Sequence, residues 1–173
     1  MRKGEFDSEM SPKLRERRVK TAAEALQSLM RLCARAEKSS GDAIRLMRTW
    51  GVAESERHGV LDRLLELRFI DDRRYAEAYV REKSQLSGWG ARKIAMQLRQ
   101  KGVAKEIIAE ALSSLDSEDM SARLKDKLQR KLRTTKAASA YELRGKLLRY
   151  ALSAGYDYDM AIDAIDAVVP QDC

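Results

Sequence analysis

The chain repeats one pattern three times: an amphipathic stretch ends at a glycine, and a second amphipathic stretch follows at once. The glycines are Gly51, Gly102 and Gly155. When the chain is aligned on them, seven of the 22 nearest positions are apolar in all three copies, whereas chance gives about two. These positions are spaced i, i+3, i+4 and i+7 on each side. The spacing predicts a helical hairpin in each copy, with the glycine as the left-handed cap of the first helix.

A further amphipathic stretch precedes each hairpin, at 21–36, 72–86 and 120–132. Each copy is therefore a three-helix unit of about fifty residues, which can barely bury enough apolar surface alone. Neighbouring units are expected to stack into an elongated array. With 6% aromatic residues and two prolines, the composition favours helix over strand, and the predicted fold class is all-α.

The predicted organisation is three three-helix repeats between two short flanking segments. Its parts are a disordered basic N-terminal extension (1–20), repeat 1 (21–70), repeat 2 (71–116), repeat 3 (117–169) and a tail (170–173). Elongated arrays present long surfaces to extended partners and seldom form a deep catalytic pocket. The pattern therefore predicts a binding protein and not an enzyme.

The charge balance favours acidic partners. The sequence has 34 Lys and Arg against 27 Asp and Glu, a formal net charge of +7, so its field attracts polyanions. The excess lies in the first hundred residues, with +5 in 1–50 and +2 in 51–100, and the remainder is neutral. The two cysteines, Cys33 and Cys173, predict neither a disulfide framework nor a metal site. No apolar stretch predicts a signal peptide or a membrane span. A reducing cytoplasm is expected, without cofactors.

Three features could carry chemistry, and each has a plainer explanation. His58 has no partner at metal-ligand spacing and is interpreted as a surface or packing residue. Asp71 and Asp72 could form the carboxylate pair of a metal nuclease, but an aspartate before a helix more often caps it. The glycine-containing loop 87–93 lacks the full phosphate-loop pattern. It either binds one phosphate or carboxylate at its free amides or only turns the chain.

The basic helix faces are more informative. On the helix around Ile94, the apolar side chains share one face, and Arg92, Lys93 and Arg99 lie on the opposite face. Such a face serves either solubility alone or the binding of an acidic polymer or protein. The acidic C-terminal stretch, which contains Asp157 and Asp163, would instead face a basic protein.

Three motifs in register resemble the RecX family, the regulators of the RecA recombinase, over about residues 21–169. They are FIDDRRYAEAYV at 69–80, GWGARKIAMQLRQKG at 88–102 and KLLRYALSAGYDYDMAIDAI at 146–165. The resemblance implies three tandem three-helix repeats in a curved, elongated molecule. It also implies a cytoplasmic protein that binds the helical groove of the RecA filament on single-stranded DNA. Such a protein would limit filament growth, ATP hydrolysis, strand exchange and repressor cleavage.

The leading hypothesis is a RecX-like modulator that inhibits RecA and acts as a monomer without chemistry of its own. Its predicted binding residues are basic side chains beside the matched motifs and on neighbouring units: Arg73, Arg74, Arg92, Lys93, Arg99, Arg45, Arg48, Arg130 and Lys131. Two rival hypotheses stay open. One is a free-standing helical DNA-binding protein that acts without RecA, and the other is the metal nuclease built on Asp71 and Asp72.

Overall fold

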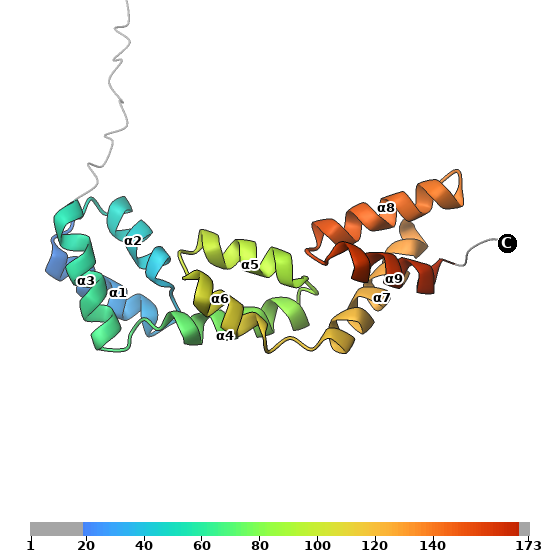
Figure 1. The fold of residues 1–173 in the computed structure, drawn as a ribbon. Coiled ribbons are helices and arrows are strands. Elements are labelled where there is room, and N and C mark those ends of the chain that lie inside the picture. Colours follow the sequence, from blue (N-terminus) through green and yellow to red (C-terminus); the bar gives the residue numbers. More distant parts are fainter. Residues whose placement is uncertain (1–18, 170–173) are drawn as a thin grey trace, which may run out of the picture.

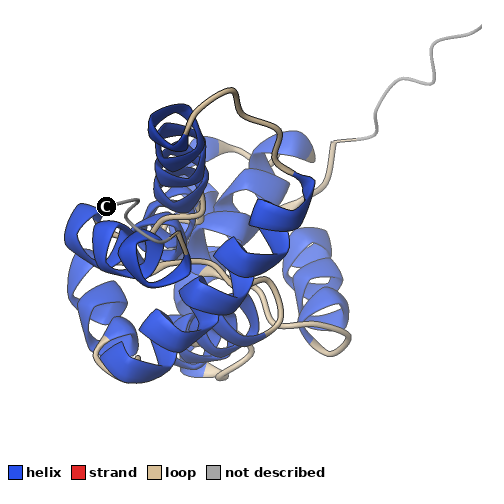
Figure 2. Cartoon of the chain, turned by 90° about the vertical axis from the view of Figure 1, so that its right-hand side faces the viewer, coloured by secondary structure: helices blue, strands red, loops and turns tan. Residues whose placement is uncertain are grey.

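The computed structural model describes residues 19–169, in which helices are joined by loops and no strand occurs (Figure 1, Figure 2). The predicted N-terminal extension, apart from its last two residues, and the predicted tail lie outside the described residues. The helices of 19–169 are α1 (Ala22–Cys33), α2 (Ser40–Thr49), α3 (Glu54–Glu66), α4 (Asp72–Gln85), α5 (Ala91–Gln100), α6 (Lys105–Leu112), α7 (Ser117–Thr134), α8 (Ala140–Ser153) and α9 (Tyr158–Val168). None of the described helices is long and apolar enough to cross a membrane.

The helices form three groups in a gently bent row (Figure 1), which confirms the predicted fold class. Each group has its own buried apolar cluster: α1–α3 pack around Leu29 and Met47, α4–α6 around Ile94 and Leu98, and α7–α9 around Leu124, Leu128 and Leu147. The helix pairs with extensive packing all lie within one group. The three buried cores therefore share no buried residue, and Leu115 packs against both the second and the third, as expected of repeats that contact only their neighbours.

The glycine caps are confirmed. Gly51, Gly102 and Gly155 have φ values of 74°, 75° and 92°, which only glycine adopts readily. The amide of each following residue donates back to a carbonyl in the last helical turn; that of Val52, for example, donates to Met47 O at 3.0 Å. The shared apolar positions are mostly buried, because each cap fixes the angle at which the third helix of the group returns over the second.

A polar side chain sets the start of most of the helices. The helix predicted at 120–132 begins three residues earlier, at Ser117, because the Asp116 side chain accepts a hydrogen bond from the amide of Asp119 at 2.9 Å. The predicted capping role in the Asp71–Asp72 pair is confirmed for Asp71, whose Oδ1 accepts from the amides of Arg73 and Arg74, each at 3.1 Å.

Capping by Asp71 predicts a pH-dependent contribution to stability. The amide of Arg74 is the largest influence lowering the pKa of Asp71 below its ordinary value of 3.8. A carboxyl with a lowered folded-state pKa stabilises the fold above its unfolded-state pKa, and this contribution disappears as the pH falls through the folded-state value. We therefore expect Asp71→Ala to lose about 1 kcal/mol of unfolding free energy at pH 7, and the difference from the parent to vanish in acid.

The matched control for that measurement is Asp71→Asn, since asparagine caps helices about as well as aspartate. Urea unfolding at pH 7 and in acid compares the three proteins. Equal stability of the alanine and asparagine variants at pH 7 would show that the cap contributes nothing.

The groups meet end to end through their second helices. Along one edge of the row, α8 is followed by α5 and then by α2, so that the C-terminus of each approaches the N-terminus of the next (Figure 1). At the first junction, between α2 and α5, Gly41 lies against Gly102; at the second, between α5 and α8, Gly90 lies against Gly155. A Cβ atom on Gly41 would be 2.2 Å from Lys101 O, so these contacts exclude any side chain.

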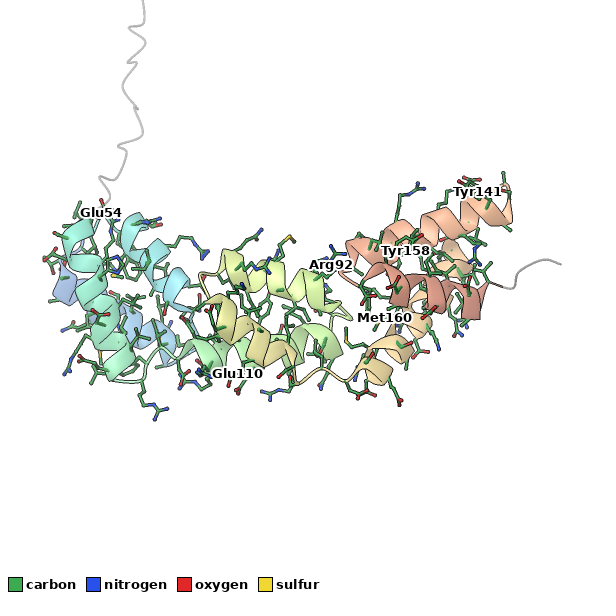
Figure 3. The ribbon with its side chains drawn as sticks, viewed as in Figure 1. Glu54, Arg92, Glu110, Tyr141, Tyr158 and Met160 are labelled. Carbon is green, nitrogen blue, oxygen red and sulfur yellow. The ribbon has the colours of Figure 1, made fainter. Side chains whose placement is uncertain are left out.

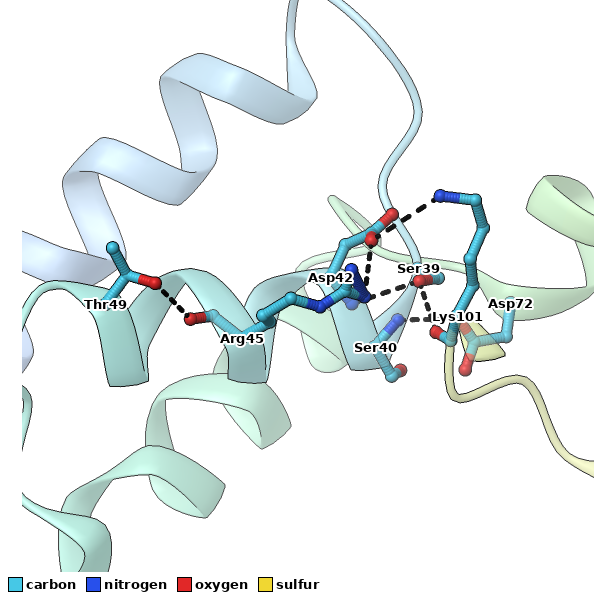
Figure 4. Close-up of polar contacts among 7 residues, drawn as sticks. All are labelled: Ser39, Ser40, Asp42, Arg45, Thr49, Asp72 and Lys101. Carbon is cyan, nitrogen blue, oxygen red and sulfur yellow. Dashed lines mark hydrogen bonds and ion pairs between the residues drawn. The ribbon is translucent and has the colours of Figure 1, made fainter. Parts of the chain in front are cut away.

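The first junction is closed by polar contacts between oppositely charged or complementary groups (Figure 4). The Ser39 hydroxyl donates to Lys101 O at 2.6 Å, and the amide of Ser40 donates to Asp72 Oδ1 at 2.8 Å. The ammonium of Lys101 lies 3.8 Å from Asp42 Oδ1. Asp72, the second member of the predicted carboxylate pair, therefore joins two helical groups.

Candidate partner-binding groove

A groove of about 860 Å³ lies where α5, α6 and the C-terminal turn of α8 meet. Figure 3 shows Arg92 at this meeting point, near the end of α5 that faces α8. The residues that line the groove come from two helical groups: Ala91, Arg92, Lys93, Ala95, Met96, Arg99, Leu112, Leu152, Ser153 and Gly155. The groove exists only where the groups stack.

Helix α5 supplies the charged wall because of its amphipathic sequence. Ile94 and Leu98 are fully buried in the core of the second group, as the sequence predicts. Arg92, Met96 and Arg99 follow at i, i+4 and i+7 and therefore share a stripe on the other side of the helix. Met96 is 47% exposed, so the stripe presents one apolar side chain between two cations.

The last turn of α8 closes one end of the groove. The amide of Gly90 donates to Ala154 O at 2.8 Å, and that of Arg92 donates to Gly155 O at 3.0 Å. These two amides are already satisfied by carbonyl groups and are not available to a phosphate or carboxylate; binding at other amides of the loop stays a prediction. The loop turns the chain, which was the other alternative, and its amides also bind the end of α8 from the neighbouring group.

The cations of the groove are not neutralised within residues 19–169. Arg92, Lys93 and Arg99 form none of the ion pairs of the described part of the chain. The ammonium of Lys93 lies 4.4 Å from the centroid of the Trp89 ring, a cation–π contact that leaves its charge in place. Leu152 is 38% exposed at the far side. The groove thus combines free positive charge with accessible apolar surface.

Two other predicted binding residues are held in ion pairs. Arg73 pairs with Glu110 of α6, within the second group. Arg74 donates to both carboxylate oxygens of Glu37, at 2.7 and 3.0 Å, and so links the second group to the first. Both are more than 40% exposed and stay predictions as binding residues, but the sequence alone did not reveal these structural contacts.

The remaining predicted binding residues lie outside the groove, and their roles stay predictions. On α2, Arg45 pairs with Asp42 at 2.9 Å, and Arg48 is exposed. On α7, the ammonium of Lys131 lies 5.2 Å from the centroid of the Tyr150 ring, and Arg130 lines a smaller cavity beside α4.

The structure adds apolar groove residues that sequence analysis missed, above all Met96 and Leu152. In the sequence, each appears only as an apolar residue on an otherwise polar helix face. Such residues are common on protein surfaces and do not by themselves indicate a binding site. The described residues contain no group of three or more His, Cys, Asp or Glu side chains placed to hold a metal ion. His58 is exposed.

Comparison with known proteins identifies the family. The sequence is 33% identical to the regulatory protein RecX of Clostridium botulinum (strain Eklund 17B / Type B) over 159 residues, which cover 91% of this chain and 69% of that protein. It is 35% identical to RecX of strain Alaska E43 / Type E3, over 85% of this chain and 68% of that protein. The chain belongs to the RecX family of regulatory proteins. The family model described as RecX, second three-helix domain, matches residues 71–112, which include α4, α5 and α6.

Solved RecX structures share the fold. The crystal structure of RecX from Lactobacillus salivarius superposes with a TM-score of 0.71 at 21% identity, covering 85% of this chain and 96% of that one. A second crystal structure, of a regulatory protein RecX, gives a TM-score of 0.73 at 22% identity, covering 84% of this chain and 71% of that one. The charged wall of the groove lies within the matched RecX domain.

Proposed function

We propose that this RecX family member modulates RecA as an inhibitor, by binding in the groove of the RecA filament on single-stranded DNA. Binding there limits filament extension, ATP hydrolysis, strand exchange and co-protease activity. The protein acts as a cytoplasmic monomer, without cofactor or membrane, in DNA repair, recombination and the SOS response. Family membership and the elongated array, which suits a rod-shaped partner, support this proposal.

The observation that carries the proposal is the groove in which Arg92, Lys93 and Arg99, which form no ion pair within residues 19–169, lie beside exposed Met96. Unpaired cations steer a protein toward an acidic partner and fix its register there. Accessible apolar groups beside them supply the buried area that holds a protein partner after encounter. A filament that carries both acidic protein surface and DNA offers both kinds of contact.

The proposal is tested by a RecA ATPase time course on single-stranded DNA, with substoichiometric protein added after filaments have formed. We expect a gradual decline in ATP hydrolysis, because blocked extension acts only as filaments lose subunits. An unchanged rate contradicts the proposed function.

The groove assignment is tested by changing Arg92, Lys93 and Arg99 together to alanine. Helicity should stay unchanged, because alanine favours helix and all three side chains lie off the core. About tenfold more protein should be needed for half inhibition of the RecA ATPase, since three charge contacts of modest strength are lost.

The matched control for the groove variant removes three basic side chains elsewhere, by changing Lys105, Lys125 and Arg133 to alanine. It has the same net charge and leaves the groove intact. Equal potency of the groove variant and the parent, or equal losses in both variants, would remove these residues from the proposed site.

A free-standing DNA-binding protein is the second candidate, favoured by the basic run on α7 that contains Arg130 and Lys131. A salt series on bare single-stranded DNA separates the two candidates. Binding that depends on phosphates loses affinity with a log–log slope of about 0.7 per neutralised phosphate. The RecA modulator should bind RecA-coated DNA more tightly than bare DNA at every salt concentration, and the free-standing protein should not.

A further inference from the structure

The second junction differs from the first in the sign of the charges around it. At the first junction, cations meet carboxylates: Lys101 lies beside Asp42, and Arg74 pairs with Glu37. At the second junction, the contacts that close the gap are neutral or involve a single cation. The Tyr156 hydroxyl donates to Gly88 O at 3.2 Å, in addition to the two backbone hydrogen bonds of Gly90 and Arg92.

One lysine joins the two groups at the second junction. The ammonium of Lys127 donates to Ser87 O and Gly88 O, each at 3.1 Å, from α7 of the third group to the loop after α4 of the second. Its surroundings are themselves positive. Burial first, and then the charges of Lys93 and Arg130, lower the pKa of Lys127.

Four cations gather around the second junction without an acidic partner among the described residues. They are Lys93 of the second group and Arg123, Lys127 and Arg130 of the third. The last three follow at i, i+4 and i+7 and therefore share one face of α7. Like charges at such spacing repel each other, and Lys93 adds repulsion across the gap between the groups.

A cavity of about 250 Å³ lies beside these cations, between α7 and the segment that ends α4. Arg123, Lys127 and Arg130 line one wall, and Ser84 and Ser87 line the other. Asp126 is the only acid among its described lining residues. The Ser84 hydroxyl donates to Arg81 O, so it is the row of cations that suits an anion with several acceptor oxygens.

We propose that the second junction binds consecutive phosphates of a single nucleic-acid strand, and that an occupied site holds the second and third helical groups together. Phosphates between Lys93 and the α7 cations replace repulsion across the junction with attraction to a shared ligand. Acidic protein surfaces fit less well, because the cavity lining is mainly polar, whereas the exposed apolar side chains Met96 and Leu152 line the separate groove along α5. The proposal goes beyond RecA modulation, since it requires neither RecA nor a filament.

Hydrogen exchange of single amides measures directly whether the second and third helical groups are held together. The amides of Gly90 and Arg92 exchange only when the second junction opens, whereas the amide of Ser40 reports on the first junction. Adding oligo(dT) to the full chain at constant ionic strength should slow exchange at Gly90 and Arg92 about fivefold or more. Exchange at Ser40 should stay unchanged. Equal slowing at all three amides, or none, overturns the proposal.

Two further anions identify the ligand. Inorganic tripolyphosphate should reproduce the protection at Gly90 and Arg92, since it supplies consecutive phosphates without bases. Polyglutamate of equal charge should not, and equal protection by polyglutamate would overturn the assignment to phosphates. For two or three phosphates, oligo(dT) affinity should fall with salt along a log–log slope of about 1.4 to 2.1.

The double variant Arg123→Gln and Arg130→Gln separates this role from a structural one, because neither side chain makes a hydrogen bond that closes the junction. In the free protein, relief of repulsion should slow exchange at Gly90 and Arg92, and the response to oligo(dT) should disappear. Faster exchange in the free variant would mean a purely structural role. The matched control, Lys125→Gln and Arg133→Gln, removes equal charge from α7 side chains that do not line the cavity and should behave like the parent.

A parent chain that inhibits RecA but shows no amide response overturns this proposal alone. A chain that shows the amide response without inhibiting RecA overturns the proposed function alone. The two outcomes are therefore distinguishable.

Discussion

The Gly155→Ala variant is expected to lose about 2 to 4 kcal/mol of unfolding free energy and to separate the second and third helical groups. Two costs add. The backbone of Gly155 has a φ of 92°, which strains any other residue, and the new Cβ would lie 2.3 Å from Lys93 Cβ. Urea unfolding followed by circular dichroism measures the loss of unfolding free energy. Small-angle scattering measures the separation of the two groups as an increased radius of gyration.

Gly145→Ala, inside the helix that Gly155 follows, is the matched control. A Cβ on Gly145 meets no atom within 4 Å, and the residue lies inside α8 with ordinary helical φ. Alanine there should stabilise the protein by up to about 1 kcal/mol. Destabilisation by both variants, or by neither, would contradict the close approach of the two groups at Gly155.

Leu124→Ala is expected to cost about 2 to 5 kcal/mol, the usual range for a fully buried leucine. Leu124 is 0% exposed in the core of α7–α9. Because the three cores are separate, the loss should fall mainly on the third group. Hydrogen exchange should show faster exchange for amides of α7–α9 and nearly unchanged exchange for α1–α3.

The control for the core variant is Leu86→Ala, since Leu86 is 83% exposed and its loss should change stability by less than about 0.5 kcal/mol. A uniform loss of protection along the whole chain after Leu124→Ala would show that the groups unfold as one unit. It would thereby contradict the independence of the three cores.

Local patterns predicted the helices and their caps well because those features depend on neighbouring residues. Gly51 and Gly102 end their helices as predicted, and Asp71 caps α4. The start of α7 was predicted three residues late, since Asp116 caps a polar first turn that carries no apolar periodicity. Periodicity detects buried faces, and capping residues must be recognised separately.

The binding groove was predicted only in part. Arg92, Lys93 and Arg99 could be selected because they lie opposite the apolar face of one helix. The groove also needs Leu152 and Gly155, which are more than fifty residues away in sequence. Arg73 and Arg74 share the same basic composition, yet carboxylates from α6 and from the loop before α2 pair with them. Composition cannot distinguish a paired arginine from a free one.

Within residues 19–169, the sequence by itself determined the amphipathic helices, their three-fold repetition and the positions that face each core, because these follow from residue spacing along one helix. Only the tertiary structure decided how the groups meet: Gly41 against Gly102, Gly90 against Gly155, and opposite or like charges around each junction. Such contacts join residues from different repeats, so they depend on how whole helices pack. No pattern within a single helix records that packing.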